Sequence, residues 1–310
     1  MLVAFGLLLP IFLLIAAGYW LRASTFVPET FWGASEKLGY WILLPALVIQ
    51  AIATRDFSGA TAGPYIVALV LTVLFHSALI MAAGLVLRTP GPSLGSVHQG
   101  AIRLNGLAAI AAGVALIGPE TIPLVALMFA VWIPLSNGLS VYGYVLLASK
   151  ETLRPGRIAI EVVKNPAIFS VIIGFGLNVF GAGPLLEKFI LLELLGRAAL
   201  PLGLLAVGAA LDLKAAAAAS ARVFSTTVLK LVVMPLVMIA LVHYLRLDPL
   251  AGAVAIICAC MPTSPGGYLV AKHLGGDAPL MASIVTLQTA LSLITVTVFA
   301  SYALDYLGGF

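Results

Sequence analysis

The sequence predicts an all-α protein that crosses a membrane many times. Of its 310 residues, 62% are hydrophobic and only 9% are charged, and the mean hydropathy is +1.15. Soluble chains are about 45–50% apolar and about 25% charged, so a soluble fold could not bury this much apolar surface. The basic residues behind the net charge of +4 are scattered over short loops and form no basic face. Basic residues in the loops of a membrane protein account for this net charge. Nucleic-acid binding, which needs a basic face, is excluded.

Windows of about 20 residues predict ten transmembrane helices. The N-terminal apolar run is long enough to cross the membrane and lacks the basic residues of a signal peptide. We therefore expect it to be a retained helix, with a cleaved leader as the alternative. The ten spans are predicted near residues 1–21, 38–54, 63–87, 97–117, 122–148, 164–181, 189–211, 220–244, 249–272 and 278–304.

The two halves of the chain resemble each other. A constant offset of 156 residues pairs Pro10 with Pro166, Gly18 with Gly174, Leu21 with Leu177, and Pro45 with Pro201. Each half holds five spans, and because five is an odd number the second half enters the membrane from the opposite side. The sequence therefore predicts a first five-helix repeat over residues 1–149, a cytoplasmic linker over 150–163, and a second, inverted five-helix repeat over 164–310.

The basic residues predict the orientation. If both termini are extracytoplasmic, the cytoplasmic connections carry ten of the sixteen Lys and Arg residues, the opposite side carries three, and three lie within spans. Cytoplasmic loops are enriched in Lys and Arg, so this orientation is the favoured one. We expect an integral protein of the plasma (inner) membrane.

The stretch "MPTSPGGYLVAKHLGGD", residues 261–277, predicts a break inside the ninth span. Pro262 and Pro265 remove two backbone donors from an apolar segment, and Gly266 and Gly267 allow another backbone to approach closely. Freed backbone groups are tolerated at membrane depth only beside protein or water, so this span should line a cavity. A proline kink that serves packing alone is the alternative.

The fourth span pairs with the ninth in the repeat, and its signal for a break is weaker. The segment "AIRLNGLAAIAAG" contains Gly106 and Gly113 but no proline, so a break there depends on these glycines and on Arg103 and Asn105. Inverted-repeat transporters bind substrate near the membrane midplane, where such discontinuous helices meet. The predicted helix-break or crossover residues are Gly106, Gly113, Pro262 and Pro265.

Blocks throughout the chain resemble the auxin efflux carrier family, among them "LPIFLLIAAGYWLR", "NPAIFSVIIGFGLN" and above all "MPTSPGGYLVAKHLGGD". This family includes bacterial permeases for malate or malonate as well as plant auxin carriers. The resemblance implies broken fourth and ninth helices that cross, a scaffold related to bile-acid symporters, and elevator-like transport of small organic anions. In the family, an Asn in the fourth span is usually followed seven residues later by Pro, whereas here Asn105 is followed by Ala112. The long cytoplasmic loop of many plant members is absent, as expected for a minimal bacterial-type carrier.

The predicted binding residues offer hydrogen-bond donors to a carboxylate. Arg103 could attract the anion or extend to the lipid headgroups, and Asn105 could donate to the substrate or tie helices together. Thr263 and Ser264 place hydroxyl groups beside the broken backbone. Two roles, lining the cavity or tying helices together, are open for Asn137, Gln288 and Thr289. The full predicted set is Arg103, Asn105, Gly106, Asn137, Pro262, Thr263, Ser264, Pro265, Gly266, Gln288 and Thr289.

Other charged or titratable residues within the spans are interpreted separately. Lys230 could balance substrate charge or stand where a cation binds in related symporters, and snorkelling to the membrane surface is the alternative. Glu193 and Arg197, four residues apart, predict a structural ion pair on one helix face. His76 has no identifiable carboxylate partner and is expected to be a hydrogen-bonded packing residue.

Among function classes, a secondary transporter explains these features best. No P-loop or H-E-x-x-H motif is present, so the sequence favours neither a nucleotide-driven pump nor a metalloprotease-type enzyme. We predict transport of a small organic anion, such as a carboxylate, an auxin-like acid or a dicarboxylate, by elevator-type alternating access. The alternatives are ion-coupled symport of a larger amphipathic anion, or a channel or sensor on the same fold. No cofactor or metal is expected, while H⁺ or Na⁺ coupling, lipid contacts and a homodimer stay open.

Overall fold

The computed structural model describes residues 1–54, 62–147, 166–187, 190–217 and 220–308. Every regular element in these residues is a helix, which confirms the predicted all-α class of a polytopic membrane protein. The predicted linker over residues 150–163 lies outside the described residues. Eight helical segments are long and apolar enough to cross a membrane: Leu2–Ala23, Glu29–Ala53, Ala62–Val86, Gly91–Leu116, Pro119–Leu147, Ile190–Ala209, Ala221–Tyr244 and Ala278–Gly308.

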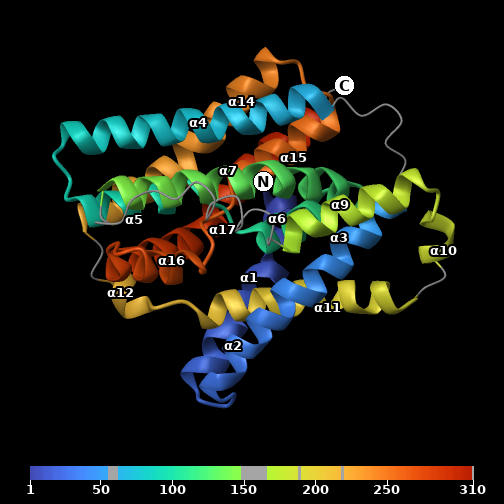
Figure 1. Cartoon of the computed structure of the whole chain (residues 1–310), viewed down its shortest axis with the longest axis horizontal. Coiled ribbons are helices and arrows are strands. Elements are labelled where there is room, and N and C mark those ends of the chain that lie inside the picture. Colours follow the sequence, from blue (N-terminus) through green and yellow to red (C-terminus); the bar gives the residue numbers. More distant parts are fainter. Residues whose placement is uncertain (55–61, 148–165, 188–189, 218–219, 309–310) are drawn as a thin grey trace.

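Several of these segments are composite (Figure 1). In the first half the helices are α1 (Leu2–Ala23), α2 (Glu29–Leu38), η1 (Gly39–Leu43), α3 (Leu44–Ala53), α4 (Ala62–Val86), α5 (Gly91–Ile102), α6 (Gly106–Leu116), η2 (Pro119–Thr121) and α7 (Ile122–Leu147). In the second half they are α9 (Pro166–Val179), α10 (Gly183–Glu187), α11 (Ile190–Ala209), α12 (Leu213–Ala217), α13 (Ala221–Val228), η3 (Leu229–Val233), α14 (Met234–Tyr244), α15 (Pro249–Ala259), α16 (Gly267–His273) and α17 (Ala278–Gly308).

Two segments contain a π-helical turn just before a proline. The turn η1 precedes Pro45, and the turn η3 precedes Pro235. Proline has no backbone N–H, and its ring displaces the carbonyl one turn earlier, so a wider local turn relieves the clash. Such turns occur frequently at functional sites, and here η1 lines the cavity described below while η3 carries Lys230.

The two halves of the chain pack closely against each other. α1 lies along α11, and α3 lies along α9. Gly18 of α1 faces the backbone of Leu205, and Gly208 of α11 faces the backbone of Ile15, so that a Cβ at either glycine would collide with the opposite helix. Because lipid is as apolar as the helices themselves, membrane helices associate through this kind of close backbone approach at small residues.

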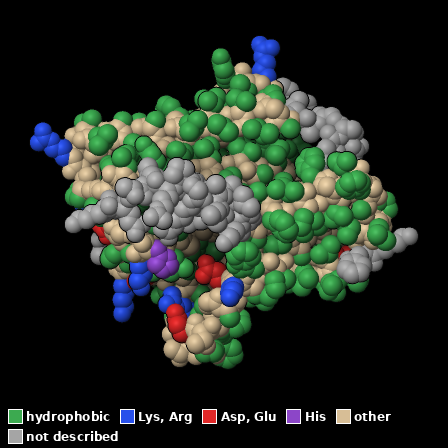
Figure 2. All heavy atoms as spheres, viewed as in Figure 1, with side chains coloured by type: hydrophobic (Ala, Val, Ile, Leu, Met, Phe, Trp, Pro, Cys, Tyr) green, Lys and Arg blue, Asp and Glu red, His purple; other side chains and the backbone are tan. Residues whose placement is uncertain are grey.

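The outer surface is apolar, as a lipid-facing surface must be. Figure 2 shows many hydrophobic side chains over the upper and right-hand parts of the visible face, with Lys and Arg at the left and upper edges and in the lower part, beside acidic and His side chains. Large side chains such as Leu13, Phe75 and Ile294 are more than half exposed on their helices. A soluble protein rarely exposes so much contiguous apolar surface, so these faces are explained by contact with lipid.

Both the fourth and the ninth segments are interrupted. α15 ends at Ala259 and α16 begins at Gly267, with Pro262 and Pro265 in the non-helical stretch between them. α5 ends at Ile102 and α6 begins at Gly106, although no proline follows Asn105. The predicted start near residue 97 was too late: α5 begins at Gly91, because Pro92 fits the first turn of a helix. Arg103 therefore lies beyond the end of α5, with extended backbone, and Gly113 lies inside α6.

Candidate functional site

The two interruptions touch each other. The backbone N–H of Asn105 donates to the carbonyl of Pro262, with 2.8 Å between nitrogen and oxygen. Residues more than 150 positions apart in the sequence are thereby joined by a main-chain hydrogen bond, which pairs two of the groups that the breaks set free. The remaining freed groups need partners from other helices.

Gln288 of α17 supplies two of these partners. Its Oε1 accepts from the backbone N–H of Thr263 at 2.9 Å, and its Nε2 donates to the carbonyl of Gly100 at 3.1 Å. The indole Nε1 of Trp132 donates to the carbonyl of Ile102 at 2.8 Å. Unpaired backbone groups are costly in a membrane, so these two buried side chains stabilise the non-helical conformation of both breaks.

The restart of the helix at Gly106 has a local cause. Asn105 is the N-cap of α6, and its Oδ1 accepts from the backbone N–H of Ala108 at 3.2 Å. Asn is among the best N-cap residues because its side chain replaces a missing backbone acceptor. Capping by Asn105 therefore begins α6 without the proline that the family pattern led us to look for.

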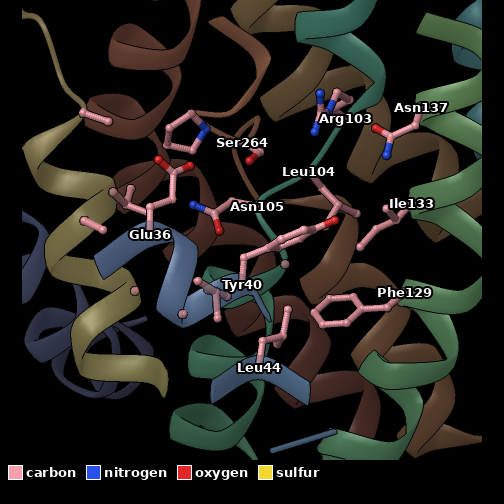
Figure 3. Close-up of a pocket in the computed structure, with 18 of the residues that line it drawn as sticks. Glu36, Tyr40, Leu44, Arg103, Leu104, Asn105, Phe129, Ile133, Asn137 and Ser264 are labelled. Carbon is pink, nitrogen blue, oxygen red and sulfur yellow. The ribbon is translucent and has the colours of Figure 1, made fainter. Parts of the chain in front are cut away.

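A cavity of about 180 Å³ opens beside the crossing (Figure 3). Its walls come from α2, η1, the start of α3, the break before α6, the start of α6, α7, α11 and the break before α16. Six of the predicted binding residues line it: Arg103, Asn105, Gly106, Asn137, Ser264 and Pro265. Leu44, Leu104, Phe129 and Ile133 form apolar parts of the wall. A concave, largely apolar pocket with a few convergent polar groups is the usual form of a small-molecule site.

Five predicted binding residues do not line this cavity: Pro262, Thr263, Gly266, Gln288 and Thr289. Gln288 is fully buried and hydrogen-bonded to both breaks, and the hydroxyl of Thr289 donates to the carbonyl of Val285 at 2.8 Å. Pro262 and Thr289 border a small apolar space on another side of Asn105, beside α1. The buried hydroxyl of Thr263 has no hydrogen-bond partner in the part of the chain that the structure describes.

Arg103 is held by a neutral side chain. With the Gln99 amide oriented to match its neighbours, Oε1 accepts from Arg103 Nη1 at 2.9 Å, and Nε2 donates to the Tyr144 hydroxyl at 2.7 Å and to the Gly267 carbonyl at 3.2 Å. The Tyr144 hydroxyl in turn donates to Ser96. Among the described residues no carboxylate lies within ion-pair distance of Arg103, so its charge is not neutralised by an acidic neighbour.

Asn105 brings a second donor to the cavity. Its side chain is only 4% exposed, and within the described parts of the chain its Nδ2 has no hydrogen-bond partner. In Figure 3 this amide nitrogen points to the side of the cavity on which Glu36 lies. Because a buried donor without an acceptor costs about 1–3 kcal/mol, a ligand oxygen at this point would recover the lost hydrogen bond.

Lys230 lies outside the cavity. It is fully buried in η3, its Nζ is 2.9 Å from Met234 Sδ, and it lies 5.4 Å from the centre of the Trp132 ring. The same indole holds the carbonyl of Ile102, so Lys230 contacts the crossing through Trp132. A snorkelling lysine would be exposed, so full burial argues against that alternative.

Two expectations about polar residues are confirmed. Glu193 and Arg197 form the predicted ion pair on α11. His76 is buried and its Nε2 lies 3.0 Å from the carbonyl of Leu229, consistent with a hydrogen-bonded packing residue.

One wall of the cavity was not predicted from the sequence. Ser35, Glu36, Gly39 and Tyr40 line it from α2 and η1, whereas the second span was predicted to begin near residue 38. The structure buries Trp32, Ser35 and Gly39. Their spacing of i, i+3, i+7 places them on one helix face, and this spacing was the signal present in the sequence. The polar residues Ser35 and Glu36 lowered the hydropathy of this stretch, so the start of the helix at Glu29 was not recognised.

The apolar helices and this cavity, with its few polar groups at two crossing helix breaks, are features of a membrane transport protein. Residues 152–300 match the family described as "Membrane transport protein". A protein of Rhizobium meliloti (strain 1021) described as "Putative malonate transporter" is 25% identical over 299 residues, which cover 94% of this chain and 93% of that protein. These similarities confirm the resemblance to permeases of the auxin efflux carrier family.

Proposed function

We propose that this protein is a secondary transporter that binds a small carboxylate anion in the cavity beside the crossing. The observation that carries the proposal is Arg103, a guanidinium that lines the cavity, has a neutral partner in Gln99, and lacks an acidic neighbour among the described residues. A carboxylate would form charge-assisted hydrogen bonds with it. The hydroxyl of Ser264 and the side-chain amide of Asn105, which has no partner among the described residues, provide further donors beside the same cavity.

We further propose how the helices are arranged in the membrane and which part of the protein moves during transport. Ten spans form two inverted five-helix repeats, residues 1–149 and 164–310, and both termini are extracytoplasmic. The crossing of the two breaks moves with the substrate in an elevator-type step. This part is supported by the repeat in the sequence, by the hydrogen bond between Asn105 and Pro262, and by the name of the malonate-transporter relative. Lys230, buried near the crossing, contributes positive charge that partly balances the anion.

Uptake of radiolabelled malonate into proteoliposomes tests the function. A carrier saturates with substrate and shows counterflow, whereas a channel does neither. We expect saturable uptake with counterflow by the wild type and a loss of at least about tenfold in malonate affinity for Arg103→Ala, since charge-assisted hydrogen bonds are worth about 1.5–3 kcal/mol.

Arg222→Ala is the matched control, because it removes an arginine that is exposed on α13 and does not line the cavity. Wild-type affinity in Arg103→Ala would exclude this cavity as the carboxylate site. Absence of uptake for malonate and for other mono- and dicarboxylates would reject the transporter proposal for anions.

A further inference from the structure

The cavity that contains Arg103 also contains a carboxylate. Glu36 projects from α2 into the lining and has no hydrogen-bond or ion-pair partner among the described residues. In the view of Figure 3, Ser264 lies between Glu36 and Arg103. The two side chains are not an ion pair, so each presents its charge to whatever occupies the space between them.

The other walls add no further charge. Tyr40 from η1 is the remaining titratable side chain in the lining, and an ordinary tyrosine is neutral at physiological pH. α7 contributes Phe129, Ile133, Ser136 and Asn137, and α11 contributes Gly203, Ala206 and Val207, with Ala210 directly after its end. The break before α16 contributes Ser264 and Pro265. The fixed charges of the cavity are therefore one positive and one negative, at separate positions.

This arrangement treats one and two carboxylates differently. When a monocarboxylate binds at Arg103, no second carboxylate of the ligand comes near Glu36. A dicarboxylate bound in the same way places its other carboxyl group in a small cavity that already contains Glu36. Glu36 is itself exposed, but two carboxylates that share one site repel each other, and one of them holds a proton as a result.

We infer that the cavity binds a dicarboxylate together with one proton, which Glu36 and the second carboxyl group of the substrate share. This inference depends on the proposed function and adds its substrate class and its coupling ion. No covalent bond changes. The proton comes from solvent on the side where the substrate enters, forms an O–H···O⁻ hydrogen bond between the two carboxyl groups, and returns to solvent when the substrate leaves. A dianionic substrate therefore crosses with one proton.

Isothermal titration calorimetry of the purified full chain with malonate tests the coupling. The pH series runs from above the second pKa of free malonate to below about 9, where tyrosine stays protonated. Because binding takes up a proton, affinity rises as pH falls and decreases by about tenfold per pH unit on the alkaline side. Titrations in two buffers of different ionisation enthalpy count the protons, and we expect about one per malonate at the alkaline end.

Glu36→Gln keeps the shape of the side chain and removes the shared proton. In this variant malonate affinity becomes independent of pH over the same range, and proton uptake disappears. Glu193→Gln makes the same chemical change outside the cavity and retains the wild-type pH dependence. Monomethyl malonate, which has a single carboxylate, binds the wild type without a proton.

The outcomes separate the two proposals. Wild-type malonate binding that is independent of pH and takes up no proton would overturn the coupling and leave the carboxylate transporter standing. Retention of proton uptake in Glu36→Gln would assign the proton to another group and overturn the role of Glu36. If Glu36→Gln does not fold, the wild-type proton count and the comparison with monomethyl malonate still decide the question. Failure of every carboxylate to bind would reject both proposals.

Discussion

At the residue scale, Asn105 performs two tasks with the two ends of one amide. Its Oδ1 caps α6, and its Nδ2 has no hydrogen-bond partner among the residues that the structure describes. Asn105→Ala removes both functions, and loss of the cap costs about 1 kcal/mol of stability. Asn105→Ser keeps a capping oxygen but has no amide donor. We expect both variants to bind malonate more weakly and only the Ala variant to melt at a lower temperature.

Melting temperature and malonate affinity, measured on the same purified samples, check this division. If Asn105→Ser bound malonate as tightly as the wild type, the free amide would have no part in the site. If both variants melted alike, the cap would contribute little to the stability of α6.

Gln99 determines how much of the charge on Arg103 is available to a ligand. It accepts a hydrogen bond from the guanidinium without neutralising it. Gln99→Glu has nearly the same shape and places a carboxylate against Arg103, so it competes with an anionic ligand. We therefore expect malonate affinity to fall by at least about tenfold although Arg103 is still present, the order of magnitude for losing a charge-assisted hydrogen bond.

Malonate titrations of Gln99→Glu and Gln99→Met test this idea. Met cannot neutralise Arg103, so it serves as the control for lost hydrogen bonds and altered packing. A weaker effect of Glu than of Met would show that the charge of Arg103 does not govern binding.

At the element scale, α17 stabilises the breaks in two other helices. Gln288 pairs the N–H of Thr263 and the carbonyl of Gly100, and both of these groups are buried. Gln288→Leu leaves both groups unpaired, at a cost of about 1–3 kcal/mol each. We expect a clearly lower melting temperature and a smaller effect from Thr289→Val, because the Thr289 hydroxyl bonds only within its own helix.

Thermal unfolding in detergent checks this order. Equal melting temperatures for the two variants would mean that water replaces Gln288 at the breaks. The test concerns stability alone, since Gln288 does not line the cavity.

At the scale of the whole molecule, the orientation in the membrane is open to a direct test. The ten-to-three distribution of basic residues predicts that a reporter fused after Phe310 is active outside the cytoplasm. A reporter inserted in the linker over residues 150–163 should be active inside. The reversed pattern would reject the predicted orientation and exchange the two faces of the membrane.

Part of this protein could be predicted from its sequence. Hydropathy determines the membrane class, because no soluble fold could bury so many apolar residues. Pro262 and Pro265 mark an interrupted helix because they lack backbone donors. In each case the cause lies within a single segment of the chain. The break at Asn105 was less evident, since an Asn cap is a weaker local signal than a proline.

Only the tertiary structure decided which polar residues meet in the cavity. Glu36 and Tyr40 enter it from a segment that was predicted as a loop and the start of a helix, while Gln288 turns to the backbone of two breaks. Hydropathy describes each helix by itself. The direction of a side chain relative to a distant break depends on how the helices pack, and therefore on contacts between residues that lie far apart along the chain.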